Sequence, residues 1–413
     1  MLTKTAIRAM LIGGLLLSFV AGSLMGQGTA RQGYSGLDKY LTQGLADDAS
    51  FVGVRAAEFL EIPVGARGIA MGSAYTAVTD DISSIWWNPA GLGFLEQREV
   101  MLTVVDYTMD LTYSYAAAAA PIGDGSVVLG GFFGYLDIPE TEITTIGSPN
   151  GTGRTYNAYD FQAGASVAYT FSDRFIGGLN AKFVHQEVLN NISGGAFAID
   201  AGAIYHTEFA GREIKFAFAI QNLGTNITMS GPNLLYEVGP EGTGGGIPGG
   251  YQNYSNPTSS PVGENEIPYA TSRRANRWAT RQTHTYRLPT VVKLAVSYNL
   301  MTSDKANWLA TGELWRNSNT PLSYASGTEV SFNFTPYMSG ALRLGWLIQS
   351  DEFTEGADDF GHAYLGDDPA TRGLSIGGGL KRDIGGKTIT FNYAYRNKGR
   401  LTADNFFTFS FGF

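Results

Sequence analysis

The chain has 413 residues and a formal net charge of −9, and it contains 54 Gly, 24 Phe and 22 Tyr but no Cys. The lack of Cys excludes disulfides, iron–sulfur clusters and thiolate zinc sites, and the negative charge argues against nucleic-acid binding, which needs a basic surface. Abundant aromatic residues and glycines, with only 16% charged residues, are typical of a membrane β-barrel with aromatic girdles and a curved sheet.

The first predicted element is a secretory signal peptide over residues 1–26. Two basic residues precede an apolar stretch, residues 9–21, that is too short to span a bilayer comfortably. No later stretch approaches 18 apolar residues, so no transmembrane helix is predicted in the mature chain. We expect cleavage before Gln27 and export to the outer membrane of a Gram-negative bacterium. Residues 27–62 are then expected to form a periplasmic or lumenal segment.

Residues 63–97 are predicted to form a helical plug, or hatch, inside the lumen of a barrel. Asp80 or Asp81 can cap a short helix that runs to Trp87, because a carboxylate accepts hydrogen bonds from the free N–H groups at a helix start. Small residues at alternate positions from 66 to 74 allow close packing against a wall. The motif residues of this predicted plug are Gly65, Ala66, Arg67, Met71, Gly72, Asp80, Asp81, Trp87, Asn88, Pro89 and Ala90.

The segments that follow alternate with period two and predict an all-β fold, a 14-stranded antiparallel transmembrane β-barrel over residues 98–413. The clearest segment sets apolar residues at alternate positions from 214 to 220 against Lys215 and Gln221. Strict alternation with charges on one side is the strand signature, and single-chain bacterial barrels have an even number of strands. The predicted strands are 98–107, 111–120, 125–136, 157–171, 174–187, 197–208, 213–223, 288–300, 306–316, 328–336, 339–349, 371–383, 386–397 and 404–413.

The connections support this count, because tight turns alternate with mostly longer loops. The long loops are expected to lie outside the cell. The acidic loop 350–370 is a candidate for calcium, although its ligand spacing matches no EF-hand. The longest loop, 224–287, is rich in Gly, Pro, Asn and Ser and then turns basic. It either binds an acidic partner or lipopolysaccharide phosphates, or forms a solvated lid. Its candidate partner-binding residues are Arg273, Arg274, Arg277 and Arg281.

The last predicted strand places Phe at every second position from 407 to 413. An apolar face of this kind is an aggregation hazard on the edge of a soluble sandwich, which is the competing interpretation, but it suits a lipid-facing strand. An aromatic-rich final strand that ends in Phe also resembles the signal read by the barrel assembly machinery. We therefore assign the predicted assembly signal to Phe409, Phe411 and Phe413.

Residues 65–93 closely resemble the PorV/PorQ family of outer-membrane proteins, which is related to the FadL-type transporters. The resemblance runs from Gly65-Ala66-Arg67 through the Asp80-Asp81 pair to Trp87-Asn88-Pro89-Ala90. It implies a 14-stranded barrel with an N-terminal plug. Some PorV-type proteins assist type IX secretion by binding cargo or the translocon at the cell surface, whereas FadL-type relatives carry fatty acids or hydrocarbons.

Two functions are therefore expected, and neither is enzymatic. The four histidines are dispersed, and no Gly-x-Ser-x-Gly elbow is present, so no metal or cofactor is predicted. The leading interpretation is assistance to type IX secretion, with cargo proteins or the translocon as partners and outer-membrane lipid around the barrel. The alternative is FadL-like transport of hydrophobic compounds through a pocket between plug and wall. The candidate lining residues of that pocket are Met71, Ile85, Trp86 and Trp87.

Overall fold

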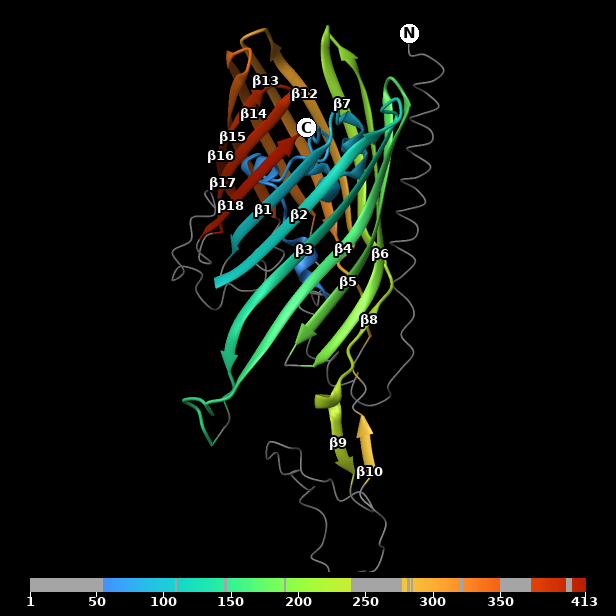
Figure 1. The fold of residues 1–413 in the computed structure, drawn as a ribbon, viewed down its shortest axis with the longest axis vertical. Coiled ribbons are helices and arrows are strands. Elements are labelled where there is room, and N and C mark those ends of the chain that lie inside the picture. Colours follow the sequence, from blue (N-terminus) through green and yellow to red (C-terminus); the bar gives the residue numbers. More distant parts are fainter. Residues whose placement is uncertain are drawn as a thin grey trace, which may run out of the picture. The chain divides into compact units, whose positions relative to one another are not determined.

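The computed structural model describes residues 55–107, 110–144, 147–188, 191–238, 277–280, 283, 285–318, 322–349, 373–398 and 403–413. Fourteen strands of these residues form a closed antiparallel barrel, in which β1 pairs with β18 to complete the ring (Figure 1). The barrel strands are β1 Glu99–Tyr107, β2 Leu111–Ile122, β3 Val127–Glu142, β4 Thr155–Ser172, β5 Phe175–Val188, β6 Ile192–Phe209, β7 Arg212–Gly224, β12 Val291–Thr302, β13 Ala306–Asn317, β14 Ser323–Thr335, β15 Met338–Gln349, β16 Leu374–Ile384, β17 Lys387–Asn397 and β18 Ala403–Gly412.

Each predicted strand corresponds to one barrel strand, and the predicted faces are confirmed. On β15, Leu342 and Leu344 are exposed on the outside whereas Arg343 is buried on the inside. On β18, Phe407 and Phe409 face outward. This alternation places apolar side chains on the outer wall, as a barrel surrounded by lipid requires.

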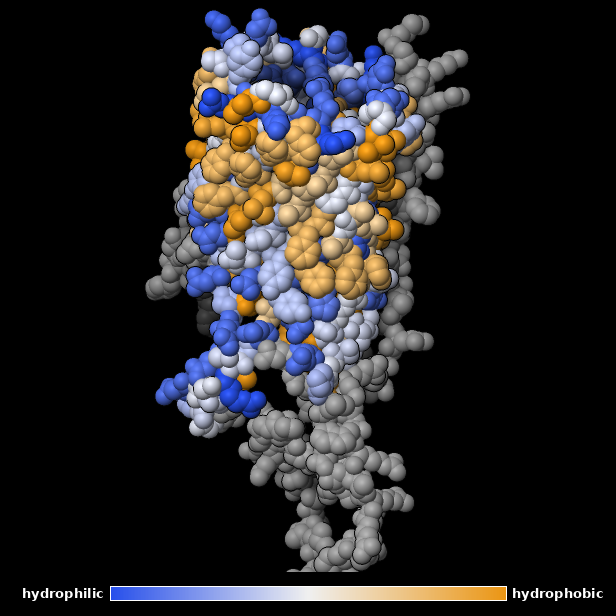
Figure 2. Space-filling view, viewed as in Figure 1, coloured by the Kyte–Doolittle hydropathy of each residue, from blue (hydrophilic) through white to orange (hydrophobic). Residues whose placement is uncertain are grey.

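Apolar side chains gather in a band on the outer face of the barrel, and hydrophilic residues lie beyond it at the top of the view (Figure 2). Highly exposed aromatic residues occur at the end of the barrel that carries the short turns, and they include Phe171, Phe209 and Tyr337. At the other end, Tyr135 stacks on Tyr159 with ring centroids 5.8 Å apart. Aromatic residues at both margins of an apolar band are the girdles of a membrane barrel. None of the helices in the described residues is long and apolar enough to cross a membrane.

The tight turns follow from local sequence. Ala210 and Gly211 have φ angles of 52° and 75°, and Gly385 and Gly386 have 60° and 80°. Positive φ at both central residues is the geometry of the two-residue turn that matches strand twist. These turns fix the register of β6 with β7 and of β16 with β17.

The long loops differ from expectation in one respect, because part of their sequence is ordered into strands. β3 and β6 are longer than predicted. The loop 224–287, for which no periodicity was expected, contains a short helical turn and two small two-stranded sheets, β8 with β11 and β9 with β10. These elements are β8 Ile227–Thr228, η5 Pro232–Leu234, β9 Leu235–Val238, β10 Arg277–Thr280 and β11 Thr285–Tyr286.

Candidate functional site

The segment before β1 lies in the lumen of the barrel, as Figure 1 shows in blue. Its Ala66 N–H donates to Thr408 Oγ1 of β18 at 2.9 Å, and its Trp86 carbonyl accepts from the Gln221 amide of β7. In the ring of fourteen strands, β18 and β7 are seven strands apart in either direction, so the segment crosses from one wall to the other. Its elements are η2 Glu58–Glu61, α3 Ala66–Ala70, α4 Ser84–Trp87 and η3 Pro89–Phe94.

A buried ionic network joins this lumenal segment to β14 and β15. Arg67 donates to both carboxylate oxygens of Glu329, at 2.8 and 2.9 Å, and also pairs with Asp80 and Asp81. Arg343 of β15 donates to the same Glu329 at 2.5 Å. Burial alone would lower the pKa of Arg67, but the carboxylates of Asp80 and Glu329 outweigh it and raise that pKa well above its usual value. Arg67 therefore stays charged and holds the segment to the wall.

The predicted Asp cap has a different main role. Asp81 accepts from the Ser83 N–H at 2.9 Å, but the N-cap residue of α4 is Ser83, and its own side chain makes no capping hydrogen bond. Asp81 also accepts from the Tyr75 hydroxyl at 2.8 Å. Burial raises the pKa of Tyr75 well above its usual value, so this hydroxyl remains a donor. Asp81 thus serves the ionic network as much as the helix.

Glycines of the wall let the segment approach closely. A Cβ on Gly345 of β15 would lie 1.9 Å from the Gly72 nitrogen, and a Cβ on Gly202 of β6 would lie 1.9 Å from Asn88 Oδ1. Both positions would clash with any side chain. The predicted small residues of the segment are therefore matched by glycines on the strands.

Asn88 fixes the local path of the chain after α4. Its side chain is fully buried, accepts from the Ala90 N–H at 3.1 Å, and donates to the Thr76 carbonyl at 3.1 Å. Pro89 follows at the first position of η3, where a missing N–H costs nothing. This pairing explains why Asn-Pro-Ala occurs at the point where the lumenal segment reverses.

Replacing Asn88 by Ala is expected to loosen η3 by about 1 kcal/mol, because a cap is lost. Amides near Ala90 should then exchange with deuterium about fivefold faster, while the barrel stays folded. Hydrogen exchange measured by mass spectrometry checks this. Asn333→Ala is the control, since Asn333 makes an exposed hydrogen bond at a turn. Equal exchange in the two variants would contradict the capping role.

Lys293 of β12 is a buried cation that sequence analysis did not single out. Its ammonium lies 4.8, 4.7 and 4.8 Å from the rings of Trp86, Trp87 and Trp315. Nζ has no hydrogen-bond partner among the described residues. Cation–π attraction offsets part of the cost of burying this charge, and it ties the two tryptophans of α4 to the wall.

The inner wall of β1–β3 carries an apolar patch. Two side chains of η2, Phe59 and Leu60, pack there, and the Phe59 ring lies edge-on to Tyr113 with centroids 6.3 Å apart. Water-filled barrels have polar interiors, so this apolar patch is a departure from a porin lumen. The inward-facing residues of the patch are Val105 of β1, Tyr113 and Tyr115 of β2, and Phe132 and Leu136 of β3.

A small cavity lies between this patch and the polar side of the lumen. It measures about 10 Å³, enough for one water molecule at most. Two of the four predicted pocket residues, Ile85 and Trp86, line it beside Leu60. The other two lie elsewhere, because Met71 packs on the wall at Gly327 and Trp87 donates from Nε1 to the Val64 carbonyl at 2.7 Å.

The remaining predicted site residues lie on or beyond the edge of the described structure. Arg273, Arg274 and Arg281 lie outside the described residues, and only the backbone of Arg277 is described, as the first residue of β10. The acidic loop 350–370 also lies outside the described residues.

The comparisons with known proteins give a fold and no family. No family model and no curated protein matches the chain. Among solved structures, a Pseudomonas putida toluene transporter, TodX, has a TM-score of 0.50 at 8% identity, over 84% of this chain and 96% of that one. A Pseudomonas aeruginosa FadL homologue has a TM-score of 0.46 at 13% identity, over 85% and 98%. A Ralstonia pickettii toluene transporter, TbuX, has a TM-score of 0.45 at 13% identity, over 84% and 97%. The chain is therefore a closed 14-stranded barrel that shares its fold with TodX.

Proposed function

We propose that this chain is an outer-membrane conduit for small hydrophobic compounds, kept closed by its lumenal segment. One observation carries the proposal, namely the apolar patch on β1–β3 that Phe59 and Leu60 cover. If these two side chains move away, a pocket opens whose wall is made of Tyr115, Phe132 and their apolar neighbours. Such a pocket favours an apolar solute over a hydrated one, because binding removes the apolar surfaces of both the pocket and the solute from water.

The outer wall and the fold support a place in the outer membrane. The barrel presents an apolar band (Figure 2), and aromatic residues lie at both margins of the band. Closed barrels satisfy every backbone group within a bilayer. TodX, whose fold the chain shares, is a toluene transporter. This likeness supports hydrophobic compounds as the cargo class, while the carrying evidence is the apolar patch of the chain itself.

Phe132→Gln should lower hydrophobic uptake about tenfold, since a buried amide without a partner costs about 1–3 kcal/mol along an apolar path. The measurement is uptake of radiolabelled toluene and palmitate by cells that express the chain, with glucose as the polar solute. Leu309→Gln is the matched control, because Leu309 is a buried inward-facing residue of β13, away from the patch. Unchanged uptake in Phe132→Gln would count against the conduit.

Assistance to type IX secretion remains the second candidate, and the resemblance of residues 65–93 to the PorV/PorQ family favours it. A secretion partner would meet the loop 224–287 on the outside of the cell. Replacing residues 240–285 with a Gly-Ser linker separates the two functions. The conduit proposal expects uptake to survive this change. If the linker variant fails to export surface proteins and Phe132→Gln leaves uptake unchanged, the secretion function is correct and the conduit proposal is wrong.

A further inference from the structure

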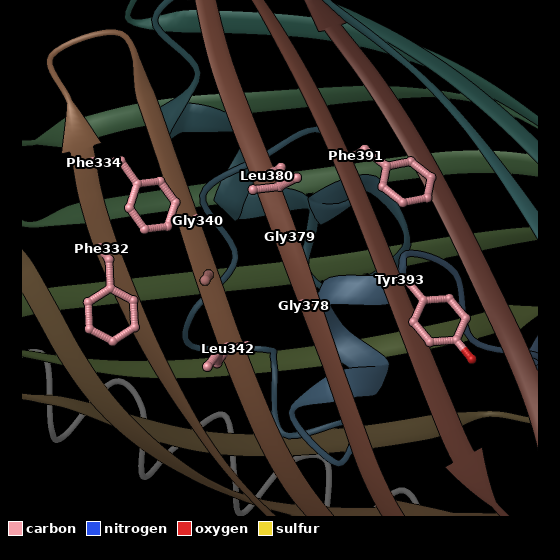
Figure 3. Close-up of a pocket in the computed structure, with 10 residues that line it drawn as sticks. Phe332, Phe334, Gly340, Leu342, Gly378, Gly379, Leu380, Phe391 and Tyr393 are labelled. Carbon is pink, nitrogen blue, oxygen red and sulfur yellow. The ribbon is translucent and has the colours of Figure 1, made fainter.

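An apolar furrow runs along the outer wall of β14 to β17, on the opposite face from the lumenal segment. Figure 3 shows its side chains on the barrel strands, with the helices of the lumen behind them. Its volume is about 520 Å³, within the range of roughly 300–1,000 Å³ that ligand sites occupy. The walls of the furrow are Phe332, Phe334, Leu342, Leu380, Phe391 and Tyr393.

Two outward-facing glycines form the floor of the furrow. Gly340 lies opposite Leu380, and Gly378 lies opposite Leu342, in the register of β15 with β16. Large and missing side chains thus alternate across the two strands. The Phe334 ring covers Gly340, where a Cβ would lie 2.7 Å from it, whereas the space above Gly378 is open. The neighbouring inward glycine is different, because a Cβ on Gly377 would meet Ala70 of the lumenal segment at 2.6 Å. Packing within the chain explains Gly377 but not the open space above Gly378.

Two exposed cations stand on the same face, beyond the furrow at the end of the short turns. Arg382 is two residues from Leu380 on β16 and lies opposite Met338, and Lys387 lies opposite Ile384. Two residues of a strand span about 7 Å, so Arg382 lies just past the apolar floor. Neither cation makes an ion pair with a described residue.

The carboxylates nearby are on other faces or have other partners. Asp383 accepts from the Thr388 hydroxyl at 2.6 Å, and together with Asp304 and Lys381 it lines a polar hollow that adjoins the furrow at Phe334. Because side chains alternate along β16, Asp383 and Lys381 point away from the face that carries Arg382. The outer face therefore presents an apolar furrow that ends at two cations, Arg382 and Lys387.

We propose that the furrow binds one anionic phospholipid of the leaflet at the short-turn end, which is the periplasmic leaflet for a barrel of this kind. One acyl chain lies over Gly378 and against the Phe334 ring, and the headgroup phosphate pairs with Arg382 and Lys387. Basic residues at headgroup depth attract anionic lipids by about 1 kcal/mol each, so two of them give a preference of roughly thirtyfold over a neutral headgroup at low salt. This proposal rests on the membrane location proposed above and on no transport activity.

Native mass spectrometry of the full chain in detergent tests the site, with phosphatidylglycerol and phosphatidylcholine of identical acyl chains as probes. The wild type should retain one phosphatidylglycerol in preference to phosphatidylcholine. Arg382→Gln with Lys387→Gln should abolish the preference. Gly378→Leu should abolish retention of both lipids by filling the floor, where a Cβ has only the Ala341 carbonyl oxygen at 3.3 Å and the Leu342 side chain at 3.9 Å near it.

Two controls carry the same chemical changes elsewhere on the barrel. Gly131→Leu fills an outer position of β3 where a Cβ meets only the Gly164 carbonyl at 3.6 Å. Arg174→Gln with Arg212→Gln removes two exposed cations at the short turns that join β4 to β5 and β6 to β7. Both should bind lipid as the wild type does. The proposal fails if the furrow variants bind lipid like the wild type or if the controls lose lipid equally. It also fails if Gly378→Leu converts a dimer of this chain to a monomer, because the furrow would then bind a second copy of the chain and not a lipid. Toluene uptake by Gly378→Leu should be normal, so the failure of the lipid site and the failure of the conduit are separately visible.

Discussion

A chain that lacks residues 63–92 is expected to form a permanently open pore in a bilayer. The wall does not need the lumenal segment for its backbone pairing, because each of the fourteen strands is hydrogen-bonded to two neighbouring strands. Deletion would also uncover charged side chains of the wall, which would then be hydrated and would line an aqueous path. These uncovered residues are Lys293, Glu313, Glu329 and Arg343.

Single-channel recording in planar bilayers measures the effect. We expect stable ion conductance for the deletion variant and none for the intact chain. Gly345→Leu tests the same idea at full length, since its side chain would occupy the place of the Gly72 backbone and expel the segment. Gly312→Leu is the matched control, because a Cβ there meets nothing within 4 Å. If both the deletion variant and Gly345→Leu form folded, heat-modifiable barrels that conduct no ions, the segment does not close the lumen.

The barrel could be predicted from sequence because its signal is local. Alternation needs only neighbouring residues, as in β15, where Arg343 stands between Leu342 and Leu344 on the opposite face. Strand ends were less predictable. β3 continues through Pro139 to Glu142, past the point where apolar alternation stops, because its backbone still pairs with β4. Hydrogen bonding between neighbouring strands therefore extends β3 beyond the end that its composition predicts.

The candidate site was predictable only in part, because its partners are distant in sequence. The motif includes Arg67, Asp80 and Asp81. Glu329, which accepts from Arg67, lies 262 residues away and has the sequence context of an ordinary strand residue. Lys293 likewise carries no local signal for its three tryptophans. Ile85 and Trp86 line a small cavity, whereas the apolar patch involves Phe59, from a stretch that is expected to precede the plug.

Replacing Glu329 by Leu is expected to have the largest effect of any single substitution in the lumen. Glu329 is the carboxylate shared by Arg67 and Arg343, and removing one partner of a buried ion pair costs about 3–5 kcal/mol. Arg67 keeps Asp80 and Asp81 on its own segment, and Arg343 keeps Asn392, which accepts at 2.8 Å. What is lost is the link between segment and wall.

Two measurements on Glu329→Leu then distinguish two roles of Glu329, which we call a latch and a strut. A latch holds the lumenal segment, so its loss raises ion conductance while the wall unfolds in urea as before. A strut holds β14 to β15, so its loss lowers the free energy of barrel unfolding without a current. Because the Arg67 bonds are bidentate and cross to the segment, we expect the latch, and a double-mutant cycle with Arg67→Leu should then show strong coupling. Glu213→Leu is the control, since Glu213 forms part-exposed ion pairs worth less than about 1 kcal/mol. If the barrel loses stability and no current appears, Glu329 stabilises the wall alone. Closure of the lumen would then depend on the close packing of the lumenal segment at Gly345 and Gly202.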